Sequence, residues 1–81
     1  MSFEKTVTIE AVGPVVVSTA QVGSGMWETC LFWEQGQPEY KWPVIVERAL
    51  VVGRYASRVA AIRGHVLNGK SEAVARAIAT S

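Results

Sequence analysis

The chain has 81 residues, of which 49% are hydrophobic, and its formal net charge is +1. A single domain of this length buries too little surface to be more than marginally stable, unless disulfides, a metal or oligomerisation contribute. One cysteine (Cys30) excludes an intrachain disulfide, and one cysteine with one histidine (His65) excludes the common four-ligand structural zinc site. Oligomerisation is the remaining aid, and the high apolar content favours it.

The N-terminal segment, MSFEKTVTIE, is polar and acidic, unlike a secretory signal. No run of residues approaches the 18 or so apolar positions that a membrane span requires. We therefore expect a cytoplasmic protein with no membrane partner.

Two alternating segments begin the chain. Residues 3–11 place Phe3, Val7, Ile9 and Ala11 on one side, which predicts a half-buried strand. Residues 15–22 are rich in β-branched side chains and predict a second strand. Gly13-Pro14 separates the two segments, so we expect a hairpin.

The next two segments also predict strands. Residues 26–34 are largely apolar on both faces, so this third strand is expected to be central. After a loop over residues 35–43, residues 44–52 are rich in valine and isoleucine and predict a fourth strand that continues towards Tyr55. A helix over 44–52 is the alternative, because residues 47–50 favour helix formation.

Helical signals start at Ser57, a predicted N-cap. Val59, Ile62 and Val66 recur at helical spacing, widened by Ala60 and Leu67, and are expected to face the core. Arg58 and Arg63 are expected to fall outside this stripe. Asn68-Gly69 predicts the helix end, because Gly69 is able to take the left-handed conformation. Ser71 is then the expected N-cap of a second short helix, with Glu72 in its first turn.

These elements predict one α+β domain over residues 1–81: an antiparallel meander of about four strands, followed by one or two C-terminal helices packed on one face. The other face of the sheet stays open. Because the strands carry apolar residues on both sides, that open face is expected to be an association surface.

Residues 64–71, GHVLNGKS, match the phosphate-loop pattern G-x-x-x-x-G-K-[ST]. A phosphate loop follows a buried strand and opens a helix, and it needs a carboxylate on a later strand to hold magnesium. Here the preceding residues predict helix, and the chain contains no aspartate. We therefore interpret the segment as a helix end, a glycine stop and a helix start, and predict no cofactor.

No catalytic or metal-binding constellation is evident. A nucleophile–base pair of Cys30 and His65 is formally possible, but a core cysteine and a histidine at the helix edge are favoured. The aromatic residues suit either the core or a protein interface. The candidate interaction surface consists of Trp27, Trp33, Tyr40, Trp42 and Tyr55.

Charge is divided unevenly along the chain. Residues 1–40 carry five glutamates against one lysine, and residues 41–81 carry seven basic residues against two glutamates. The two halves are expected to pair with each other, in the fold or across a dimer. The alternative is a basic face for nucleic acid or an acidic partner. Its candidate residues are Arg54, Arg58, Arg63, Lys70 and Arg76.

Two segments carry a family resemblance. WETCLF (27–32) and RYASRVAAIRGH (54–65) resemble, in the same order, stretches of small proteins encoded by bacteriophages and by bacteria that carry phage genes. The resemblance implies a strand-then-helix layout and a phage origin, with no catalytic residues to transfer. It also implies that Gly64 lets the helix approach the sheet closely, with His65 at the edge of that contact.

Together these patterns predict a small non-enzymatic interaction protein, a homodimer or higher oligomer that contacts a host or phage protein. One alternative is a basic nucleic-acid-binding module that uses the C-terminal helical face. A further alternative is a structural component of a virion.

Overall fold

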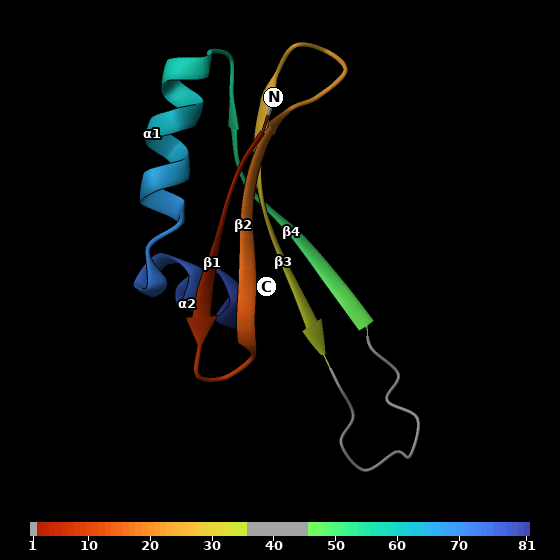
Figure 1. The fold of residues 1–81 in the computed structure, drawn as a ribbon, viewed down its shortest axis with the longest axis vertical. Helices are drawn as coiled ribbons and strands as arrows, with labels where there is room; N and C mark the ends of the chain where they lie inside the picture. Colours follow the sequence, from red (N-terminus) through yellow and green to blue (C-terminus); the bar gives the residue numbers. More distant parts are fainter. Residues whose placement is uncertain (1, 36–45) are drawn as a thin grey trace.

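The computed structural model describes residues 2–35 and 46–81 (Figure 1). Four strands are followed by two helices, in the order that the sequence predicts. The elements are β1 (Ser2–Ile9), β2 (Gly13–Gln21), β3 (Trp27–Gln35), β4 (Val46–Tyr55), α1 (Arg58–Asn68) and α2 (Ser71–Ala79). The α+β prediction is confirmed, and the fourth segment is a strand rather than a helix.

The strands form one antiparallel sheet in the order β1-β2-β3-β4, so each strand pairs with its neighbour in sequence. Gly13 is the first residue of β2 and directly follows the tight β1–β2 turn. Its φ is +84°, a backbone angle that residues other than glycine rarely adopt. The predicted hairpin and the meander are both confirmed. A β-bulge interrupts the β3–β4 ladder, because Thr29 pairs with Gly53 while Cys30 pairs with Val51.

Both helices cover the same face of the sheet, which gives a two-layer molecule (Figure 1). α1 lies over β2, β3 and β4, whereas α2 packs against β1. The apolar core is concentrated beneath α2, where Val74 is fully buried. The buried cluster consists of Val7, Ile9, Val15, Val17, Leu31, Trp33 and Val74.

The helix α1 has the opposite orientation to the one predicted. Its buried residues are Ala61 and Gly64, whereas Val59, Ile62 and Val66 are exposed. The prediction that these three apolar residues face the core is wrong. Small residues let the helix backbone approach the sheet, and the large apolar side chains are left on the outside.

The helix boundaries follow the sequence signals with two corrections. Ser57 is the N-cap of α1, as predicted, and its hydroxyl accepts a hydrogen bond from the Ala60 N–H at 3.2 Å. Gly69 has φ −88°, so it does not adopt the left-handed conformation. Ser71 is the first residue of α2 rather than its cap; the cap position is Lys70, whose side chain makes no capping hydrogen bond.

Candidate functional site

The contact between α1 and the sheet is unusually polar. Thr19 on β2 and Thr29 on β3 are cross-strand partners, both fully buried, and their hydroxyls lie 2.7 Å apart. The Thr19 hydroxyl is also hydrogen-bonded to Nδ1 of His65, at 2.7 Å. This chain of three side chains joins two central strands to the middle of α1. Buried hydroxyls are tolerated here because each of them has a partner.

A second connection runs through Tyr55, at the end of β4. Its ring occupies the space that a side chain would fill at Gly53 and at Gly64, so both glycines are required for this close packing. Its hydroxyl accepts a hydrogen bond from Nδ2 of Asn68, at 2.8 Å. The expected role of Gly64, to let the helix approach the sheet, is therefore confirmed, and His65 lies half-buried beside the contact.

Burial lowers the pKa of His65 below its ordinary value of 6.5, and the nearby Lys5 ammonium lowers it further. The aromatic neighbour of His65 is Phe3, whose ring stacks on Trp27 with centroids 5.9 Å apart. The Arg58 guanidinium lies 5.9 Å from the centre of the Phe3 ring, within the range of a cation–π contact. Burial and the Lys5 ammonium therefore both favour the neutral form of the imidazole.

The outer side of α1 carries an apolar surface, which we call the α1 ridge. It consists of Val59, Ile62, Val66 and Leu67, with exposed fractions of 61, 41, 55 and 61%. Arg63 lies within it, because Val59, Val66 and Leu67 are its neighbours at helical spacings of four, three and four residues. An exposed apolar surface of this kind is typical of a protein-binding site.

Sequence reasoning named these apolar residues but assigned them to the core. The signal that could have placed them correctly is the pair of small residues Ala61 and Gly64, on the opposite side of the helix. A stripe of small residues marks the side on which a helix can pack most closely.

The predicted aromatic surface is largely part of the fold. Trp27 and Trp33 are each only 5% exposed, so the core interpretation holds for them and the interface interpretation is wrong. Tyr55 is half-buried between the sheet and α1. Tyr40 and Trp42 lie outside the described residues.

The five residues of the predicted basic face are all exposed. Arg54 pairs across the strands with Glu28 at 2.9 Å, which joins the acidic and the basic halves of the chain at one point. Arg76 lies 3.6 Å from Glu72 on the next turn of α2. Among the side chains of residues 2–33 and 49–81, Arg58, Arg63 and Lys70 form no ion pair.

The suggested pair of Cys30 and His65 does not form. Thr19 and Thr29, which connect His65 to the sheet, point to the face that the helices cover. Cys30 follows Thr29 in β3, so its side chain points to the opposite face of the sheet, away from His65. Burial and the carboxylate of Glu28 raise the pKa of Cys30, although Arg54 opposes them. A thiol with a raised pKa is a weak nucleophile.

The segment GHVLNGKS has the interpretation predicted for it. Residues 64–68 belong to α1, Gly69 follows, and Ser71 begins α2. The Gly69 N–H donates to the carbonyl of His65 at 2.9 Å, so it is engaged in ending the helix. A side chain at Gly69 would meet that carbonyl and the methylene groups of Lys5. Packing therefore accounts for both glycines of the motif.

In the part of the chain that the structure describes, no helix has the length and apolar character needed to cross a membrane. In the same residues, no group of three metal-ligating side chains comes together. No protein-family model, curated protein or solved structure matches the chain. The α1 ridge is therefore the candidate functional site on geometric grounds alone.

Proposed function

We propose that this chain is a small non-enzymatic interaction protein that works by protein–protein contact, as a homo-oligomer, and that the α1 ridge binds a partner protein. The observation that carries the proposal is the orientation of α1: small residues face the sheet, and four large apolar side chains face outwards. Exposing these side chains to water contributes nothing to the fold of the single chain, whereas burying them against a partner is favourable.

The positive charge of Arg63 on the ridge restricts which protein surfaces can bind there. Arg63 lies among the apolar residues, so a protein that covers the ridge must either provide a carboxylate for this guanidinium or leave a buried charge unpaired. α1 itself contains no acidic residue. A second α1 packed symmetrically on the first would oppose cation to cation. The ridge therefore suits a different protein, with an apolar surface that carries acidic groups.

The test compares two variants as baits in affinity capture from a bacterial lysate. Val59→Ser/Val66→Ser removes two of the four apolar side chains of the ridge, and Val22→Ser makes one such change at an exposed position near the β2–β3 turn. We expect proteins held by the wild type and by Val22→Ser to bind the ridge variant about tenfold more weakly, which corresponds to about 1.4 kcal/mol.

Neither variant should alter the stability of the chain by more than about 0.5 kcal/mol, because the replaced side chains are exposed. Equal capture of the same proteins by the wild type and the ridge variant would contradict the proposal.

Nucleic acid is a second candidate partner, supported by the exposure of Arg58, Arg63 and Lys70, none of which forms an ion pair among the described residues. Binding of this kind would weaken steeply as salt concentration rises. Arg58→Gln/Arg63→Gln should then weaken the binding of a labelled DNA or RNA oligonucleotide. No binding of either oligonucleotide at low salt would exclude this candidate.

A further inference from the structure

The two edges of the sheet differ in how they are protected against pairing with another strand. An edge strand presents unpaired N–H and C=O groups, and natural proteins commonly protect such an edge with charged or polar side chains. The edge strand β1 carries the exposed residues Glu4, Lys5, Thr6 and Thr8. The other edge strand, β4, has no charge over residues 49–53, which read Ala-Leu-Val-Val-Gly.

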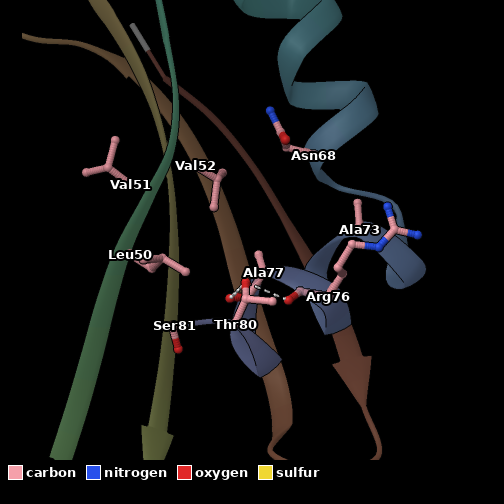
Figure 2. A pocket seen from close by; sticks show the side chains of 9 residues that line it. All are labelled: Leu50, Val51, Val52, Asn68, Ala73, Arg76, Ala77, Thr80 and Ser81. Carbon is pink, nitrogen blue, oxygen red and sulfur yellow. Dashed lines mark hydrogen bonds between the residues drawn. The ribbon is translucent and has the colours of Figure 1, made fainter.

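A groove lies beside the uncharged part of β4, on the side that the helices cover. Its volume is about 440 Å³, and Figure 2 shows it between β4 and α2. Leu50 and Val52 line it from the strand and Ala73 and Ala77 line it from the helix, while Asn68, Arg76, Thr80 and Ser81 give it a polar part. The groove exists because α2 packs towards β1 and leaves the inner side of β4 only partly covered. A strand added to the β4 edge would direct alternate side chains into this groove.

We propose that β4 pairs antiparallel with β4 of a second copy, which would form one continuous sheet with four strands from each copy and the helices of both on the same side. This contact is separate from the α1 ridge. It rests on the proposed function, because it is the contact between copies in the proposed homo-oligomer. We assign the site to a second copy because β4 is uncharged on both of its faces at this point. Its inner residue Leu50 is apolar, and its outer residues Ala49 and Val51 are exposed and uncharged, so two copies can pair at this point without bringing charges together.

The register follows from the faces of the strand. In a continuous sheet, side chains that lie opposite each other must point to the same face. A two-fold axis beside Leu50 places the Leu50 side chains of the two copies together on the inner face, and places Ala49 opposite Val51 on the outer face. On that outer face the pair extends a half-buried apolar strip that contains Val16 and Phe32, cross-strand partners in the same sheet.

The first test measures molar mass by light scattering at micromolar concentrations. We expect the wild type to be a dimer of twice the 8.8 kDa chain mass. Ala49→Lys/Val51→Lys puts charges on the exposed side of β4 and should halve the molar mass. Thr6→Lys/Thr8→Lys makes matched changes at exposed positions of β1 and should remain a dimer. The ridge variant Val59→Ser/Val66→Ser should also remain a dimer, which separates this proposal from the proposed function.

A cross-linking measurement keeps the test valid if the lysine variant fails to fold. In a Cys30→Ser background, Ala49→Cys/Val51→Cys should form interchain disulfides on mild oxidation, whereas Thr6→Cys/Thr8→Cys should not. A monomeric wild type overturns the proposal. So does a dimer that survives in the folded lysine variant of β4 while β4 cysteines fail to cross-link. A dimer lost only in the ridge variant would move the self-contact to α1 and would also overturn it.

Discussion

Thr19 is the residue on which the polar contact beneath α1 depends, because its hydroxyl serves both Thr29 and His65. Thr19→Val should leave two polar groups without their partner and lower the free energy of unfolding by about 1–3 kcal/mol. Thr29→Val should cost less, about 0.5–1.5 kcal/mol, because Thr19 keeps its bond to His65. Urea denaturation of both variants measures the difference, and equal losses would contradict this account.

His65 makes the stability of the fold depend on pH. Its pKa is lower in the folded chain than its ordinary value of 6.5, so the unfolded chain binds the proton more readily. The stabilisation is fully present above about pH 6.5 and is lost as pH falls through the lowered pKa of the folded state.

Because His65 is the single histidine, and histidine is the side chain that ordinarily changes its charge between pH 5 and 8, the slope of stability against pH between about pH 7 and 5 belongs to this residue. His65→Gln should flatten that slope in denaturation curves measured at several pH values. A slope that persists in the variant would assign the effect to another group.

A substitution at Gly64 tests whether α1 depends on its close approach to the sheet. Gly64→Ala places a methyl group where the Tyr55 ring lies. The overlap should cost about 1–3 kcal/mol, partly offset by about 1 kcal/mol gained in helix propensity. We expect a net loss of stability by urea denaturation. Gly23→Ala is the matched control, because the space around Gly23 is open, and it should be neutral. A neutral or stabilising Gly64→Ala would show that the ring moves aside freely.

The helix α1 rests on fewer apolar contacts than α2 does. Beneath α1 the buried helix residues are Ala61 and Gly64, whereas α2 places the fully buried Val74 in the main core. Local opening costs less where less apolar surface is buried. In hydrogen-exchange mass spectrometry we expect peptides from residues 58–68 to exchange faster than peptides from 71–79. A partner that covers the α1 ridge should slow exchange in the first segment, and equal protection of both helices would contradict this ranking.

The sequence predicts the elements of this protein better than it predicts which sides of them meet. Strand β3 was recognisable because both of its faces are apolar, and Trp27 and Leu31 are indeed buried. For α1, apolar spacing selected the wrong side. The decisive contacts were not visible locally, because Thr19 is 46 residues from His65 and Tyr55 fills the space beside Gly64 only once both are in place. Long-range packing by small and polar residues leaves no periodic apolar signal.

The molecule as a whole divides its helix-covered face into two unlike regions. Beneath α2 lies the apolar core, and beneath α1 lie Thr19, Thr29 and the half-buried ring of Tyr55. Opposed charges contribute little to this structure. Among the side chains of residues 2–33 and 49–81, Glu28–Arg54 is the one ion pair between strands, and Arg54 is well exposed. The fold therefore depends on burial and on satisfied hydroxyls, and we expect added salt to change its stability little.

The packing of α2 against β1 has a consequence for the order in which the chain folds. Every strand pairs with the strand next to it in sequence, so the sheet needs only short loops to close and can form progressively during synthesis. The apolar core cannot form progressively during synthesis, because Val74 of α2 packs in one cluster with Val7 and Ile9, at the other end of the chain. Until α2 leaves the ribosome, the nascent sheet exposes its most apolar surface to chaperones and to other nascent chains.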